Sequence, residues 1–199
     1  QAYLDETRRI RHDFKHTIAV LNELSQTGQY EKLQEYISNY SSEISNVQAP
    51  ATYCDNPVVN ATIHYYIDIA QSYGIRTKLQ VVIPKKIAIS DIDLCLIFGN
   101  LLDNAVTACR HVRTDARFIR LSADLDTPGH LYITMVNSFD GNVCTRNGKY
   151  ISTKERKSGI GLASIQATTQ KYHGSSNFYT EQHEFISNIM LKLKENETE

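Results

Sequence analysis

The chain has 199 residues, of which 41% are hydrophobic, and its formal net charge is −1 at pH 7. This length suits one large domain or a small domain followed by a medium one, and the apolar fraction suffices for a hydrophobic core. The near-zero charge argues against nucleic-acid binding, because such proteins usually present a strongly basic domain or face. The 4 cysteines are widely spaced without a C-x-x-C pair, which argues against a zinc ribbon or a redox dithiol.

The surroundings of the cysteines and the hydropathy of the chain indicate its compartment. Cys95 and Cys109 lie among apolar residues, so we expect both to be small core residues in a reducing cytosol. No apolar run approaches the roughly 18 residues that span a bilayer. The chain begins inside a helical pattern without a methionine. We therefore expect a soluble fragment of a longer protein.

The first 48 residues predict two helices joined by a short turn. Apolar and threonine side chains recur at alternating steps of four and three over 1–26 and again over 31–47, which is a heptad seam. The seam positions are Tyr3, Thr7, Ile10, Phe14, Thr17, Leu21 and Leu24, then Leu33, Ile37, Tyr40, Ile44 and Val47. A helical hairpin this small cannot bury its seam alone, so we expect a homodimer in which two hairpins form a four-helix bundle.

A linker around Pro50 separates this hairpin, residues 1–48, from a second domain, residues 49–199, whose pattern mixes helices and strands. The predicted fold class is therefore α+β. In chain order we expect helices over 57–73 and from Ser90 or Asp91 to His111, and strands over 76–83, 118–124 and 131–137. Gly74 is expected to end the first of these helices.

The segment 138–158 is polar and shows no periodicity, so we expect a long functional or mobile loop. A helix should follow from Gly161 to Gly174. Strands over 176–180 and 185–193 should close the domain, before a charged tail.

The first candidate for chemistry is the run from Arg11 to His16. His12 lies two residues past the seam position Ile10, which rotates it about 200° round the helix and away from the packed face. Transfer of a phosphoryl group to imidazole needs an accessible neutral nitrogen, and Asp13 could orient the ring or accept its proton. The alternative is an ordinary charged helix face.

A second alternative is a metal site. His12 and His16 are four residues apart on one helical face, and His-Asp-x-x-His is similar to the His-Glu-x-x-His signature of zinc proteases. Aspartate is shorter than glutamate, however, and nothing nearby supplies a third ligand, with His64 as the best remote candidate. A dimer seam is also a poor place for a protease cleft, so this alternative is disfavoured.

Two further patterns suit a magnesium nucleotide. Asn100 and Asn104 lie one turn apart on an otherwise apolar helix, and their amides need polar partners such as Mg²⁺ and phosphate. Gly159 and Gly161 open the next helix, where backbone N–H groups at the positive helix end suit a phosphate. The alternatives are solvent exposure for the amides and a simple turn for the glycines. This glycine pattern is neither a dinucleotide fingerprint nor a Walker A loop.

Taken together, the run Arg11-His12-Asp13-Phe14, the segment 99–105 and the segment 159–162 resemble the histidine kinases of the GHKL ATPase superfamily. The form resembles the quorum-sensing receptor kinases of the accessory-gene-regulator type, which lack the usual Asp-x-Gly-x-Gly box. The resemblance implies a GHKL-type α/β sandwich that binds ATP and Mg²⁺, behind the dimerising hairpin. It implies autophosphorylation on histidine, then phosphotransfer to the aspartate of a response regulator at the cytoplasmic side of a bacterial membrane.

The resemblance also implies residue roles. His12 matches the phosphoacceptor and Asp13 its acidic neighbour, while Asn104 matches the Mg²⁺-binding asparagine and Asn100 lies near the phosphates. Gly159 and Gly161 match the glycine box. Asn137 stands where other histidine kinases have an adenine-reading aspartate. The segment 138–158 matches the lid over ATP, in which Lys154 is a candidate phosphate contact.

Two departures from the family matter. His16 stands where the family usually has an asparagine or threonine that positions water, which puts phosphatase activity in doubt and makes His16 a minor alternative acceptor. Asn137 is neutral, so we expect weak ATP affinity from the loss of a charge-assisted hydrogen bond. Two other functions remain open: a catalytically silent ATP-binding or phosphotransfer scaffold, and an ATPase of the gyrase or chaperone kind. The ATPase is disfavoured because Asn100 cannot activate water.

Overall fold

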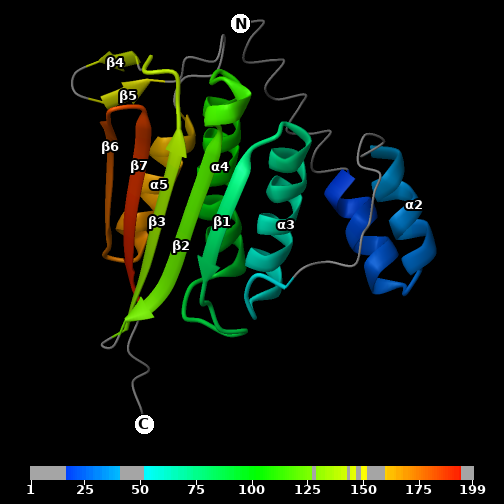
Figure 1. Ribbon diagram of the computed structural model, residues 1–199. Helices are drawn as coiled ribbons and strands as arrows, with labels where there is room; N and C mark the ends of the chain where they lie inside the picture. Colours follow the sequence, from blue (N-terminus) through cyan, green and yellow to red (C-terminus); the bar gives the residue numbers. More distant parts are fainter. Residues whose placement is uncertain are drawn as a thin grey trace, which may run out of the picture. The chain divides into compact units, whose positions relative to one another are not determined.

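The structure is a computed structural model (Figure 1), in which the chain divides into two compact units, residues 1–49 and 50–199. The residues whose structure is described are 17–40, 52–126, 129–142, 144–146, 149–151 and 160–193.

The first unit contains two helical segments joined by the predicted turn. Residues 17–26 are helical, and the helix α2 follows as Tyr30–Tyr40. Gly28 has a φ of 68°, and the N–H of Gln29 donates to the carbonyl of Leu24 at 2.9 Å, which is a Schellman ending. The predicted continuation of the second helix to Val47 lies outside the described residues.

The described part of the first unit has no core of its own. No residue from 17 to 39 is buried. The seam residues Leu21, Leu24 and Leu33 are only half-buried, and Ile37 is 47% exposed. The apolar seam that the sequence predicted is therefore not covered within one chain over these residues.

Over its described residues, the second unit combines three α-helices with a five-stranded sheet and a small hairpin. In chain order these elements are α3 (Pro57–Ser72), β1 (Arg76–Val81), α4 (Asp91–Arg110), the short 3-10 helix η1 (Thr114–Ala116), β2 (Phe118–Asp126), β3 (His130–Ser138), β4 (Cys144–Arg146), β5 (Lys149–Ile151), α5 (Ile160–Lys171), β6 (Ser175–Glu181) and β7 (Glu184–Lys192). The sheet order is β1-β2-β3-β7-β6, and only β1 and β2 pair in parallel. This mixed sheet with helices confirms the α+β prediction for this unit.

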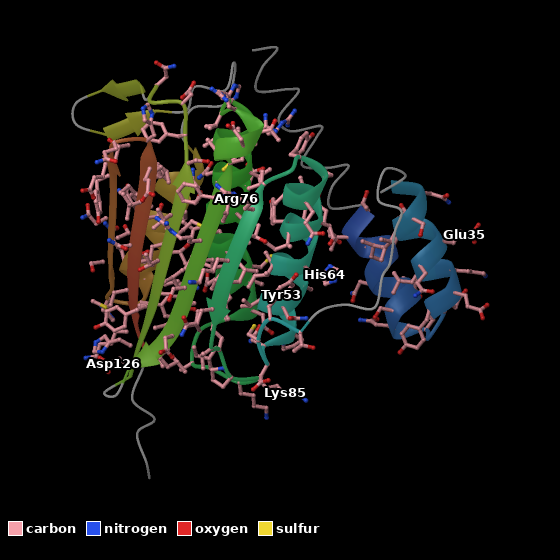
Figure 2. All side chains as sticks on the ribbon, viewed as in Figure 1. Glu35, Tyr53, His64, Arg76, Lys85 and Asp126 are labelled. Atoms are coloured by element: carbon pink, nitrogen blue, oxygen red, sulfur yellow. The ribbon has the colours of Figure 1, made fainter. Side chains whose placement is uncertain are left out.

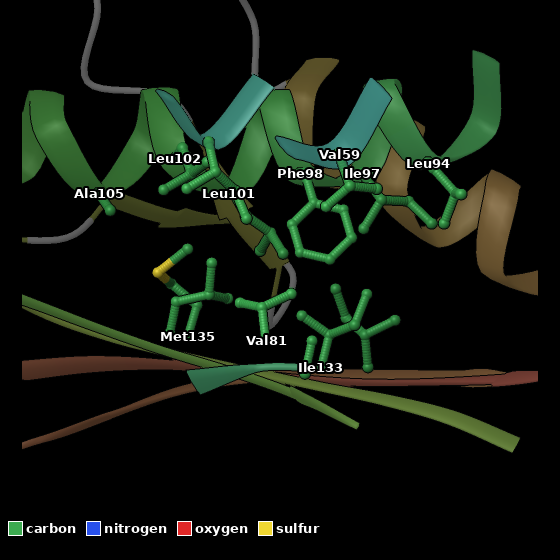
Figure 3. Packing of buried hydrophobic residues seen from close by; sticks show 14 of the residues in the cluster. Val59, Val81, Leu94, Ile97, Phe98, Leu101, Leu102, Ala105, Ile133 and Met135 are labelled. Carbon is green, nitrogen blue, oxygen red and sulfur yellow. The ribbon is translucent and has the colours of Figure 1, made fainter. Parts of the chain in front are cut away.

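The core lies between the sheet and the helices. Alternation along β3 puts Leu131, Ile133 and Met135 on the side that faces the helices, and all three are at most 1% exposed. Figure 3 shows Leu94, Ile97, Phe98 and Leu101 of α4 opposite Val81, Ile133 and Met135 of the strands. Burying this much apolar surface supplies the main favourable term in folding.

The helix boundaries follow the capping signals in the sequence. Asn56 caps α3 by accepting from the N–H groups of Val58 and Val59, and Ser90 caps α4 by accepting from the N–H of Asp93. Gly74, with a φ of 66°, ends α3 as predicted. At the end of α5 the left-handed residue is His173, with a φ of 50°. Gly174 is needed for another reason, since a Cβ there would lie 1.9 Å from the carbonyl oxygen of Met190.

Three sequence predictions need correction. By length and composition α4 is apolar enough to cross a membrane, contrary to our expectation of no such run, because it is the core helix of the sheet. Cys109 is buried as predicted, but Cys95 is exposed, with its Sγ atom 3.7 Å from Thr62 Oγ1 of α3. The segment 138–158 is not wholly irregular: β4 and β5 pair as an antiparallel hairpin within it.

A polar network joins the start of α4 to the end of α5. The carboxylate oxygen Oδ2 of Asp93 accepts hydrogen bonds from Ser90 Oγ, Lys171 Nζ and Tyr172 OH, each at 2.6 Å. We call these four residues the Asp93 cluster. Burial acts to raise the pKa of Asp93, but the hydrogen bonds, led by the one from Lys171, outweigh it and lower the pKa to about 2.

This shift predicts an acid-sensitive contribution to stability. Because the folded pKa of Asp93 lies below the unfolded value of 3.8, the stabilisation is present above about pH 4 and lost as the pH falls towards 2. It amounts to roughly 2 kcal/mol in the free energy of unfolding. Denaturant unfolding of the unmodified chain and Asp93→Asn should therefore differ most at pH 5–7 and converge only as the pH falls through about 2. A difference that does not vary with pH would contradict this assignment.

Candidate functional site

The two amides that the sequence singled out lie side by side on α4. Asn100 and Asn104 are both half-buried, in a helix whose neighbouring positions Leu101, Leu102 and Ala105 are in the core. The amide nitrogen of Asn100 donates to the carbonyl of Leu96 at 2.8 Å, one turn earlier. This bond orients the Asn100 side chain, and the Oδ1 atom of the amide remains as its acceptor.

The first turn of α5 packs directly against these amides. A Cβ at Gly161 would lie 3.0 Å from Asn100 Oδ1 and 3.4 Å from Asn104 Nδ2. Gly161 therefore lets the backbone come closer to the amide pair than a side chain would easily allow. The first N–H groups of α5 have no partner within the helix and carry the positive end of its dipole. The structure thus brings Asn100, Asn104 and Gly161 together.

Asn137 lies on the same side of the sheet. It is 3% exposed, near the end of β3, and alternation places it with Ile133 and Met135 on the helix-facing side. Its amide nitrogen donates to the carbonyl of Ser138 at 3.0 Å. The Oδ1 atom is therefore the acceptor that a ligand such as an exocyclic amine could use.

Ser187 is a polar residue of this face that the sequence reasoning missed. It is 3% exposed on β7, where it pairs with Met135 of β3. Two residues further along β3, Asn137 pairs with Phe185 of β7. The available signal was the alternation of β7, which places Ser187 with the buried Ile189 and Leu191. A buried hydroxyl on an apolar strand face is a candidate polar contact for a ligand.

The remaining candidates fall outside the described residues. These are His12, Asp13, Lys154 and Gly159, together with His16. Their predicted roles as phosphoacceptor, acidic neighbour and phosphate contacts stay predictions.

The described residues offer no support for the alternative metal site. Among them, no group of three or more His, Cys, Asp and Glu side chains could hold a metal ion. His64, the candidate remote ligand, instead has its Nδ1 atom 3.1 Å from Asp68 Oδ2 and its ring centroid 6.2 Å from that of Tyr53 (Figure 2). Amide oxygens such as those of Asn100 and Asn104 are, by contrast, ligands of the kind that Mg²⁺ takes beside phosphates.

Comparison with known families identifies the class of this fold. Residues 89–192 match the family described as the GHKL domain, which is just over half of the chain. The chain therefore belongs to the GHKL domain family. The match runs from the residue before Ser90 to the end of β7, so it contains the amide pair, Gly161, Asn137 and Ser187. A comparison with curated protein sequences gave no match.

Solved structures of histidine kinases share the fold. The histidine kinase AdeS of Acinetobacter baumannii is 13% identical with a TM-score of 0.54, over 92% of this chain and 98% of that one. The mycobacterial sensor histidine kinase MprB is 16% identical with a TM-score of 0.52, over 68% and 93%. Full-length ShkA, solved in complex with AMPPNP, is 15% identical with a TM-score of 0.53, over 75% and 32%. At these identities the likeness shows the fold.

Proposed function

We propose that this chain is the ATP-using part of a bacterial sensor histidine kinase. It transfers the γ-phosphoryl group of ATP to His12, and the phosphoryl group then passes to an aspartate of a response regulator. The observation that carries this proposal is the approach of Gly161 to within contact of Asn100 and Asn104 in a GHKL fold.

The described residues divide the work of holding ATP. Asn137 offers Oδ1 to the amino group of adenine, and Ser187 offers a hydroxyl nearby on the same face. The first turn of α5 donates N–H groups to the phosphates, and Asn104 holds Mg²⁺ through its amide oxygen. Bound Mg²⁺ neutralises charge on the transferring phosphoryl group.

Catalysis then rests mainly on positioning, with Asp13 orienting His12 and Lys154 and Gly159 contacting the phosphates.

The proposal extends to partners and location. The uncovered seam of the described first unit supports a homodimer built by its helices, with Leu21, Leu24 and Leu33 as the residues to be covered. The run from Arg11 to Phe14 supports the accessory-gene-regulator type of receptor kinase. Such a kinase acts at the cytoplasmic side of the bacterial membrane, attached to membrane-spanning sensor helices.

Labelling with γ-labelled ATP and Mg²⁺ tests this proposal. We expect acid-labile label on the unmodified chain and none on His12→Gln. Label that persists in His12→Gln but disappears in the His12→Gln/His16→Gln chain would move the acceptor to His16. Undiminished labelling of both variants would refute a histidine acceptor in this segment. ATP binding without any labelling would indicate the silent scaffold.

A further inference from the structure

The Asp93 cluster lies outside the proposed nucleotide site and ties together three elements. Asp93 belongs to the first turn of α4, while Lys171 and Tyr172 form the end of α5. The hydroxyl of Tyr172 also accepts from the N–H of Ser90 at 3.0 Å, and its carbonyl accepts from the N–H of Lys192, the last residue of β7, at 3.0 Å. The end of α5 is thus fixed to both neighbours.

The helices α4 and α5 run antiparallel, and two of their contacts lie at similar spacings along both helices. Gly161, at the start of α5, meets Asn100 and Asn104, while Lys171, at its end, meets Asp93. At 1.5 Å per residue, Gly161 to Lys171 spans about 15 Å, which falls between the spans of about 10.5 Å from Asp93 to Asn100 and about 16.5 Å from Asp93 to Asn104. A helix pinned at its end by the cluster therefore has its first turn level with the amides.

The first turn of α5, at the end far from the Asp93 cluster, tolerates little axial movement of the helix. A shift of α5 by one residue along its axis would move Gly161 by about 1.5 Å. That distance is large beside the 3.0 Å separation between a Cβ at Gly161 and Asn100 Oδ1. The Lys171–Asp93 contact is also partly protected, since the side chain of Asp93 is only 12% exposed.

We infer that Asp93 is a positioning residue for the phosphate end of the nucleotide. Through Lys171 and Tyr172 it holds α5 in the axial position at which the first turn of that helix reaches both the phosphates and the amide pair. Asp93 does not touch the ligand. The inference rests on the proposed function, because the phosphates are those of the ATP that the site is proposed to hold.

Comparison of two ligands separates positioning from general stability. ATP uses both the base contacts and α5, whereas adenosine has no phosphate and uses the base contacts alone. In Asp93→Asn and Lys171→Met we expect the Kd for MgATP to rise about tenfold and the Kd for adenosine to change less than about twofold. Lys171→Arg, which keeps the charge and the donor, should restore most of the affinity for MgATP.

Two controls keep the test decisive. Asp115→Asn removes an exposed ion pair with Arg113 and should change neither Kd. Tyr172→Phe removes both hydrogen bonds of the Tyr172 hydroxyl, to Asp93 and from the N–H of Ser90, but keeps the Lys171 contact. It should give a smaller effect of the same kind, should Asp93→Asn fail to fold. Equal losses for ATP and adenosine, or no loss for either, would overturn the positioning role. Failure of the unmodified chain to bind ATP would instead overturn the proposed function, and the positioning role with it.

Discussion

Replacing Gly161 with alanine is expected to weaken MgATP binding at least tenfold while leaving the second unit folded. The new Cβ would lie 3.0 Å from Asn100 Oδ1, and the Asn100 amide is held in place by its bond to the Leu96 carbonyl. Either the amide or the first turn of α5 must move, and both belong to the proposed phosphate end. Titration of the variant with ATP in the presence of Mg²⁺ measures the loss.

Gly99→Ala provides the matched control. Gly99 lies in α4 next to Asn100, but a Cβ there would have no heavy atom within 4 Å apart from its chain neighbours and the backbone of its own helix. Gly99→Ala should stabilise α4 by up to about 1 kcal/mol, because alanine is the better helix former in a helix interior. We therefore expect Gly99→Ala to bind MgATP like the unmodified chain. If Gly161→Ala bound equally well, the close contact between α5 and the amides would have no part in nucleotide binding.

Replacing Asn137 with aspartate is expected to lower the free energy of unfolding by about 1–3 kcal/mol at pH 7. Asn137 is 3% exposed and donates to the carbonyl of Ser138, a bond that a carboxylate cannot make. The loss should shrink in mild acid, because a protonated carboxyl can donate to that carbonyl. Denaturant unfolding at pH 7 and pH 5 measures both effects.

The control for this prediction is an asparagine whose side chain accepts a hydrogen bond, whereas that of Asn137 donates one. Asn188, half-buried on β7, accepts from Thr134 Oγ1 at 3.1 Å through its Oδ1 atom, and an aspartate would keep that bond. Asn188→Asp should therefore cost much less than Asn137→Asp. Equal losses in the free energy of unfolding, or an Asn137→Asp chain as stable as the unmodified one, would contradict the prediction. The bond to the Ser138 carbonyl would then not favour asparagine over aspartate at this position.

This orientation also gives a physical reason for the departure from the family pattern at Asn137. The sequence showed only that a neutral amide replaces the expected acid and predicted weak ATP affinity. The structure adds that the amide nitrogen satisfies the Ser138 carbonyl at the end of β3. That contact depends on the course of the chain after Asn137, which the sequence pattern does not describe.

The features predicted best are those set by local chemistry. Ser90 caps α4 and Gly74 ends α3, because each satisfies helix-end groups only a few residues away. The family resemblance assigned Asn100, Asn104 and Gly161 to one nucleotide site, but it did not predict the close approach of Gly161 to the amides. Periodicity alone does not say that α5 packs antiparallel to α4.

The features missed depend on short elements or distant partners. β4 and β5 contain 3 residues each, too few to show alternation. Asp93 looked like one more acidic residue in a helix start, since its partners Lys171 and Tyr172 lie almost eighty residues along the chain. Ser187 was missed although the alternation of β7 places it with the buried Ile189 and Leu191, because a lone serine in a strand gives no sign of a ligand contact.

The most direct test of the central claim is the Kd of the unmodified chain for ATP, measured with and without Mg²⁺ beside Asn104→Ala. If Asn100, Asn104 and the first turn of α5 hold a magnesium nucleotide, binding will be saturable, and removal of Mg²⁺ or of the Asn104 amide will weaken it at least tenfold. Affinity that is the same in all of these conditions, or no binding by the unmodified chain, would contradict the account.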